Sequence, residues 1–123
     1  MAKIQSHRDL RVWQKGMDLV VAIYAVSKQL PREERYGLIQ QATRAAVAVP
    51  ANIAEGHARG TRRDYAHFVS IARGSLMEVE TYVMIVERLH LADQTSVSGV
   101  LERITELSRM LTALRQRLLE PVS

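Results

Sequence analysis

Cysteine is absent from this sequence of 123 residues. The absence excludes disulfides, thiol catalysis and cysteine-ligated metal sites, and it fits a reducing cytosol. Long hydrophobic runs are also missing: the longest stretch without a charged residue, 45–54, is about half of a membrane span and contains Pro50 and Asn52. The first fifteen residues hold no apolar segment of the kind that a secretion signal needs. We therefore expect a soluble, cytoplasmic protein with no membrane partner.

The rest of the composition is that of an ordinary globular chain. Hydrophobic residues make up 47% and charged residues 24%, which argues against disorder, and the length fits one domain. The formal charge is +4, and fourteen of the seventeen basic residues are arginine. Arginine suits phosphate recognition because its planar fork donates two parallel hydrogen bonds. A bias in genome base composition explains the same preference, so the charge alone leaves both readings open.

Strand-like alternation is nearly absent, and apolar residues recur instead at helical spacing. The pattern predicts helices at about residues 8–29, 33–55, 61–89 and 95–119. Pro31 and Pro121 end the first and last of them, Gly56 is a left-handed stop for the second, and Thr61 caps the third. Four amphipathic helices joined by short turns predict an all-α fold: an antiparallel up-down-up-down four-helix bundle, forming one domain over residues 1–123.

Two of the predicted helices are apolar on two sides. We assign the core stripe of the first helix to Leu10, Trp13, Met17, Val20, Val21 and Tyr24, and its second stripe to Val12, Leu19, Ile23, Val26 and Leu30. The third helix has a second set outside its own core stripe, Phe68, Ile71, Tyr82 and Ile85. A helix that is apolar on two sides is normally covered on both. We therefore predict a homo-oligomer packed through the second stripes. The alternative is a wide stripe that touches two neighbours within one bundle.

The stretch VPANIAEG places a proline near the end of the second predicted helix. Pro50 lacks an amide hydrogen and collides with the carbonyl group of Ala46, so the helix should loosen there. Asn52 borders the core stripe, where its side chain can satisfy backbone groups. Glu55 lies in the last turn, where the helix dipole disfavours an anion, so it should pair with an arginine or a backbone donor. We interpret Pro50, Asn52, Glu55 and Gly56 as structural rather than catalytic residues.

Four stretches cover most of the chain: RVWQKGMDLVVAIY, RYGLIQQATRAAVAVPANIAEG, FVSIARGSLMEVET and ELSRMLTAL. They resemble the four-helix-bundle family related to the product of intervening sequences in bacterial 23S ribosomal RNA genes. The most specific parts are YGL at 36–38, PANIAEG at 50–56 and ARGSL at 72–76. The chain departs from the family at Ala48, where serine is usual, and at 41–43, where an Ile-Arg pair is more typical. The resemblance implies a cytosolic pentamer of helical bundles with no settled activity. Members are loosely connected with RNA, and a distant relative is an accessory factor for a reverse transcriptase.

The segment GHARGTRRDYAHFVSIAR joins the second and third predicted helices. It carries Arg59, Arg62, Arg63 and Arg73 against a single acid, Asp64. Cations beside the unpaired N–H groups of a helix start make an attractive anion site. We predict that these four arginines bind RNA or DNA, and that an oligomer repeats the site. The alternatives are a solvated helix entrance, with the arginines paired to glutamates, and a scaffold that binds another protein without nucleic-acid contact.

An enzymatic role has little support in the sequence. Asp64-x-x-His67 and Glu87-x-x-His90 have the spacing of di-iron ligands, but both pairs lie on one predicted helix. A di-metal site in a bundle takes its pairs from two facing helices. No glycine-rich phosphate loop follows a strand, and no serine or lysine nucleophile has an evident base partner. We predict no catalysis, no metal and no cofactor.

Overall fold

The structure, a computed structural model, describes residues 6–121. A 3-10 turn, His7–Asp9, precedes four helices: α1 (Arg11–Ser27), α2 (Gln40–Ala58), α3 (Arg62–Arg88) and α4 (Gln94–Leu119). A second 3-10 turn, Arg32–Glu34, and a π-type turn, Arg35–Ile39, connect α1 to α2. No strand occurs within residues 6–121, and the predicted all-α class is confirmed.

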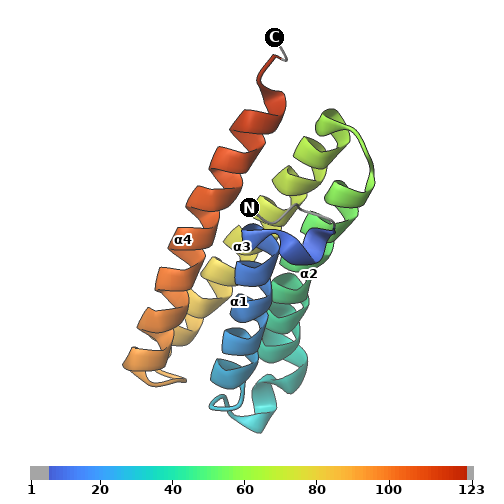
Figure 1. The fold of residues 1–123 in the computed structure, drawn as a ribbon. Coiled ribbons are helices and arrows are strands. Elements are labelled where there is room, and N and C mark those ends of the chain that lie inside the picture. Colours follow the sequence, from blue (N-terminus) through green and yellow to red (C-terminus); the bar gives the residue numbers. More distant parts are fainter. Residues whose placement is uncertain (1–5, 122–123) are drawn as a thin grey trace.

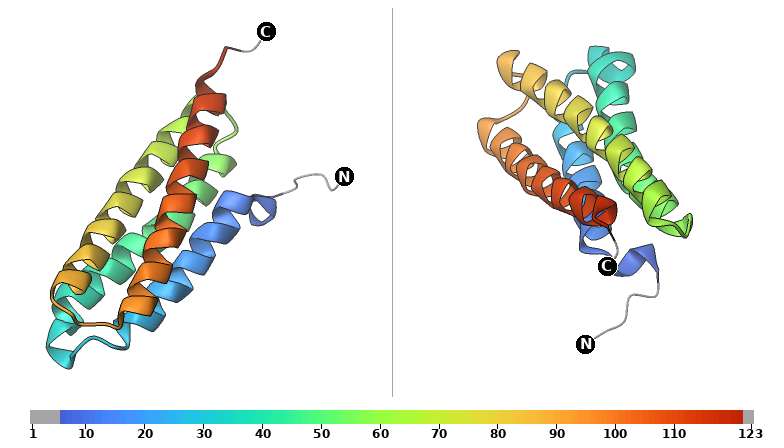
Figure 2. Two further views of the ribbon diagram at one scale, coloured as in Figure 1. Left: turned by 90° about the vertical axis from the view of Figure 1, so that its left-hand side faces the viewer. Right: turned by 90° about the horizontal axis from the view of Figure 1, so that it is seen from above.

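The four helices form an antiparallel bundle in which each helix has two neighbours. α1 packs against α2 and α4, and α3 packs against the same two helices, so α1 and α3 lie diagonally opposite each other. Figures 1 and 2 show that α1 begins only part of the way along the bundle, whereas α4 and the turn between α2 and α3 extend beyond it. Among the described helices, none has the length and apolar character needed to cross a membrane.

The core is built from aliphatic side chains and alanines of all four helices. The largest fully buried ones are Leu19, Ile23, Ile53, Leu76, Ile104, Leu107 and Leu111. The predicted inward stripes of the second, third and fourth helices are largely confirmed. Their buried members are Ala42, Ala46, Val49 and Ile53 in the second, Val69, Ala72, Leu76, Val79, Val83 and Val86 in the third, and Val97, Ile104, Leu107 and Leu111 in the fourth. The remaining predicted members, Ile39, Tyr65, Leu101, Leu114 and Leu118, are only partly buried.

The predicted core stripe of α1 is only partly correct, because this helix turns its other apolar side fully inward. Leu10, Trp13 and Val20 pack against the edge of the core, whereas Met17, Val21 and Tyr24 are exposed. Leu19 is fully buried, whereas Val21 is 69% exposed. Gly16 explains the choice. It lies on the Leu19 side of α1, and a Cβ atom added there would come 3.3 Å from Cβ of Pro50 in α2. A glycine on this side lets the two helices approach closely, which the side carrying Trp13 and Tyr24 would prevent.

The bounds of α2 also differ from the prediction. The helix begins at Gln40 because Gly37, with φ −109° and ψ −109°, breaks the preceding turn. It runs through Pro50 and Gly56 to Ala58, and the left-handed residue that follows is Gly60, with φ +87°. Gly56 is therefore not a helix stop. It is buried against α3, where an added Cβ atom would lie only 2.7 Å from Cβ of Phe68.

Side-chain caps fix the starts of α3 and α4. The hydroxyl of Thr61 accepts a hydrogen bond from the amide of Asp64 (3.1 Å), as predicted. The carboxylate of Asp93 accepts one from the amide of Ser96 (2.8 Å) and another from the Ser96 hydroxyl (2.7 Å). The amide of Asp93 in turn donates to Oε1 of Gln29 (2.8 Å), just beyond the end of α1. This last contact joins the first helix to the fourth.

Two glycines in helix interiors should respond to alanine in opposite ways. Gly56→Ala should destabilise the fold by about 1–3 kcal/mol, because the new methyl group overpacks the α2–α3 contact. Gly74→Ala should stabilise it by about 0.5–1 kcal/mol, because no atom lies within 4 Å of the new Cβ and alanine favours the helix. Urea unfolding of both variants checks the signs. A stable Gly56→Ala protein would contradict this packing.

The cap at Asp93 should make stability depend on acid pH. The hydrogen bonds from Ser96 lower the pKa of Asp93 below its ordinary 3.8, so the charged form is favoured in the folded state. The stabilisation is therefore complete above pH 3.8 and is lost as pH falls through the lower folded pKa. Asp93→Asn keeps a capping side chain without the charge. Its melting temperature should lie below that of the wild type at pH 7, and the difference should close toward pH 2. A constant difference would show that the charge of Asp93 contributes nothing.

Candidate nucleic-acid interface

The predicted basic turn lies at one end of the bundle, between the last turn of α2 and the first turn of α3. Arg59 is the residue after α2, Gly60 supplies the left-handed backbone, and Thr61 caps α3. Arg62 and Arg63 follow at once as the first two residues of α3, and both are exposed. The turn therefore holds three arginines close together because the connection between the two helices is short.

Arg59 lies on the α2 side of this end. Its Nε atom is 3.4 Å from the carboxylate of Glu55, one turn earlier, and its guanidinium carbon lies 4.9 Å above the ring of Phe68. This pairing of Glu55 matches the expectation from the helix dipole. Both side chains of the ion pair are about half exposed, so the pair contributes at most about 1 kcal/mol. Its main effect is to hold the guanidinium group in place on the surface of α3.

Arg62 and Arg73 lie on the α4 side of α3. The guanidinium group of Arg62 donates a hydrogen bond to the backbone carbonyl of Arg117 near the end of α4. Arg73, three turns further along α3, lines a shallow depression of about 280 Å³ together with Ser70 and Ser108. The structure therefore separates the four predicted arginines. Arg59 lies toward α2, whereas Arg62 and Arg73 lie along the border with α4.

Sequence reasoning missed the arginines that α4 adds to this border. Nε of Arg115 donates to the hydroxyl of Ser70 on α3 (2.6 Å), and the backbone carbonyl of Arg117 accepts the hydrogen bond from Arg62. The Arg117 side chain lies nearby and lines a groove next to the start of α1. Cations in the last turns of a helix are favoured by its dipole. The available signal was the clustering of Arg109, Arg115 and Arg117 at the end of the fourth predicted helix. Antiparallel packing of α3 and α4 brings that end beside the start of α3.

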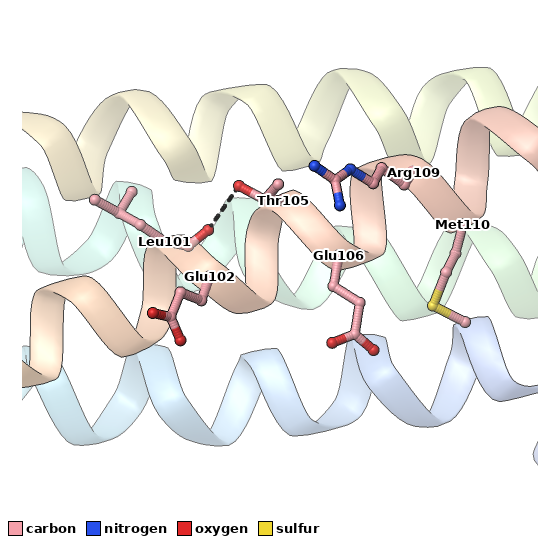
Figure 3. A pocket seen from close by; sticks show the side chains of 6 residues that line it. All are labelled: Leu101, Glu102, Thr105, Glu106, Arg109 and Met110. Atoms are coloured by element: carbon pink, nitrogen blue, oxygen red, sulfur yellow. Dashed lines mark hydrogen bonds between the residues drawn. The ribbon is translucent and has the colours of Figure 1, made fainter.

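The outer face of α4 shows how the charge changes along the helix (Figure 3). An open depression of about 580 Å³ is lined by Leu101, Glu102, Thr105, Glu106, Arg109 and Met110. Figure 3 shows Glu102 and Glu106 pointing toward α1 and Arg109 pointing toward α3. Glu106 lies 3.0 Å from Nζ of Lys15, which holds the pKa of this carboxyl below its ordinary value. The acidic half of α4 is thus distant from the basic turn, and the arginine-rich half adjoins it.

The stretch around Pro50 has packing roles. Pro50 is buried against Gly16 of α1. Nδ2 of Asn52 donates to the backbone carbonyl of Ala48 (2.8 Å). Asn52 therefore hydrogen-bonds a backbone group as expected, although that group is the carbonyl of Ala48 and not the carbonyl of Ala46, to which Pro50 cannot donate.

The two pairs with di-iron spacing, which the sequence does not support as a metal site, lie at opposite ends of α3. His67 lies near the start of α3, and His90 just follows its end. Within the described residues, no group of three or more histidine, aspartate or glutamate side chains is placed to hold a metal ion.

Most of the predicted oligomer interface on α1 is corrected by the structure. Val12, Leu19, Ile23 and Val26 lie in the core of a single chain, and Leu30 packs against that core. They cannot face another subunit because α2 and α4 already cover them.

The apolar surface that remains open has other members. On α1 it consists of Met17, Val21 and Tyr24, three of the six residues first assigned to the core. On α3, Ile71 and Ile85 are exposed as predicted, at 39% and 36%, whereas Phe68 and Tyr82 are partly buried. Two open apolar faces therefore persist, one on α1 and one on α3.

Comparison with known proteins identifies the family. No curated protein matches the chain. A solved structure from Bacteroides thetaiotaomicron, titled as a protein with unknown function from the S23 ribosomal protein family, has the same fold with a TM-score of 0.78 and 22% sequence identity. The alignment covers 85% of this chain and 98% of that one. Residues 8–113 match the family described as 23S rRNA-intervening sequence protein, and the chain therefore belongs to that family.

Proposed function

We propose that the protein is a non-enzymatic, cytoplasmic homo-oligomer that binds RNA or DNA through the arginine-rich end of each bundle. The observation that carries the proposal is the meeting of two basic segments at that end. Arg59, Arg62 and Arg63 come from the turn between α2 and α3, and Arg115 and Arg117 come from the end of α4. The family name refers to a ribosomal RNA gene and is compatible with this proposal.

The arrangement suits a phosphate backbone better than a small anion. The arginines follow the border between α3 and α4 from Arg62 to Arg73, over three helical turns, and do not surround one enclosed pocket. Three turns span about 16 Å, a distance that covers several phosphates of an extended strand. Repetition of this border in an oligomer would multiply the contacts and raise the affinity without new chemistry.

The two open apolar faces support a ring rather than a symmetric dimer. They lie on α1 and α3, which are diagonally opposite in the bundle. A contact between the α1 face of one chain and the α3 face of the next joins unlike surfaces, and such heterologous contacts close into rings. A pentamer, which the family resemblance implies, is a ring of this kind.

A protein-interaction scaffold is the second candidate function. Met77 and Met84 on α3 are 41% and 43% exposed, outside the faces assigned to the ring. These side chains offer apolar area to a protein partner. Binding of such a partner would be nearly independent of salt, whereas binding through arginines to phosphates weakens steeply as salt rises.

Two single substitutions test the ring. Val21→Arg on the α1 face and Ile85→Arg on the α3 face should each reduce the wild-type oligomer toward the 13.9 kDa monomer, because each buries a charge in the contact. Thr105→Arg, on the outer face of α4, is the control and should leave the oligomer intact. Light scattering measures the mass, and circular dichroism checks folding.

Mixing the two variants separates a ring from a symmetric dimer. Each variant retains the face that the other has lost, so an equimolar mixture should form a dimer with one copy of each chain. With symmetric contacts, in which a face pairs with the same face of another copy, a variant that keeps its contact face would instead dimerise by itself, without the other variant. A monomeric wild-type protein at micromolar concentration would refute the oligomer altogether.

Matched arginine variants test nucleic-acid binding. Arg59→Ala/Arg62→Ala/Arg63→Ala should weaken binding to a single-stranded RNA about tenfold or more at ~0.1 M salt, and should reduce the salt slope by up to about 2. Arg32→Ala/Arg35→Ala/Arg88→Ala removes the same charge from the opposite end of the bundle and should bind nearly as the wild type does. Equal losses in both variants would indicate a response to net charge alone, and unchanged binding in the first would exclude the basic end.

A further inference from the structure

A groove opens where α1 begins and α4 continues past it. α1 starts at Arg11, and the preceding turn, His7–Asp9, is held beside the helix by an edge contact between the rings of His7 and Trp13 (5.1 Å). The last turns of α4 therefore have no helix opposite them on this side, as Figures 1 and 2 show. The resulting groove has a volume of about 300 Å³. Ligand sites commonly occupy about 300–1,000 Å³, so the groove lies at the small end of that range.

The walls of the groove are apolar and its rim is positively charged. Leu10 and Val12 form one wall, and Met110 and Leu114 form the other. Arg11 and Arg117 also line it, and both are exposed, so they belong to the solvent side. The positive charge of Arg11 contributes to the lowered pKa of Glu106 on α4, but the Glu106 carboxylate forms its ion pair with Lys15. The rim therefore keeps cationic groups from two helices above an apolar interior.

Tyr65 of α3 lines the groove from the side of the core and carries a polar atom with nothing to bind. Its hydroxyl oxygen is buried and has no hydrogen-bond partner within the described part of the chain. Burial raises the pKa of Tyr65 above its ordinary 10.0, which keeps the hydroxyl protonated and able to donate. A buried donor without an acceptor is unfavourable, and a ligand that supplies the acceptor removes the penalty. Met110 lines the same groove, and its flexible chain can change rotamer to admit such a group.

We propose that this groove binds a small aromatic acid: an apolar ring between the leucine and methionine walls, a carboxylate at Arg11 and Arg117, and a hydrogen-bond acceptor at the far end that reaches the Tyr65 hydroxyl. The inference shares Arg117 with the proposed nucleic-acid surface but does not depend on nucleic-acid binding. It rests on the shape of the groove, the charge of its rim and the hydroxyl without a partner.

Three probes of similar size separate these contributions in ligand-observed NMR with the full chain. 4-Hydroxyphenylacetate offers both the carboxylate and the oxygen acceptor, phenylacetate lacks the acceptor, and tyramine replaces the anion with a cation. The first should bind with a Kd of about 0.1–1 mM. Phenylacetate should bind about 3- to 10-fold more weakly, and tyramine should not bind measurably. Equal binding of all three would overturn the proposal.

Variants of the groove locate the site. Tyr65→Phe should abolish the preference for 4-hydroxyphenylacetate over phenylacetate while leaving phenylacetate binding unchanged. Arg11→Gln/Arg117→Gln should weaken both acids about fivefold or more. Ala113→Phe adds a ring at an exposed position lining the groove and should reduce binding at least tenfold, whereas Ala25→Phe, exposed on α1 outside the groove, is the matched control. Circular dichroism confirms folding of each variant. Wild-type binding by Ala113→Phe, or a preference that survives Tyr65→Phe, would place the ligand elsewhere and overturn the assignment.

Discussion

The close packing of α2 between its two neighbours sets the geometry on which the other features depend. Gly16 of α1 leaves room for the ring of Pro50, and Gly56 of α2 leaves room for Phe68 of α3. Both contacts tolerate little added volume, since interiors are packed as densely as organic crystals. Before Pro50, α2 presents mainly alanines to the core, at 42, 45 and 46. Because the buried side chains of α2 are small, α1 and α3 can pack close to its backbone. This close approach decides which side of α1 is buried.

The basic end of the molecule follows from helix lengths and antiparallel packing. Because α2 continues to Ala58 and α3 begins at Arg62, the turn between them is short and concentrates its arginines. Because α4 runs back along α3 for its full length, the arginines of its last turns meet the first turns of α3. The hydrogen bonds from Arg62 to Arg117 and from Arg115 to Ser70 then hold the two groups together. The surface is thus assembled from segments separated by about half of the chain.

The short first helix has two consequences for the surface of the bundle. Since α1 has 17 residues and α4 has 26, the end of α4 is left without a partner and the groove above Tyr65 remains open. Since α1 is apolar on both sides, burial of the Leu19 side leaves Met17, Val21 and Tyr24 in contact with solvent. One helix therefore supplies both the groove and an apolar face suited to assembly.

The sequence by itself determined the helical class, the number of helices, most of the inward stripes of α2, α3 and α4, and the cap at Thr61, because periodicity and capping act over neighbouring residues. It left the orientation of α1 undecided, since two stripes of similar hydrophobicity satisfy the same period. Only the tertiary structure decided that question, through the fit of Gly16 against Pro50, and only it joined Arg115 and Arg117 to the basic turn and brought Tyr65 to the groove. Such contacts link residues far apart in the chain, and a local pattern carries no information about them.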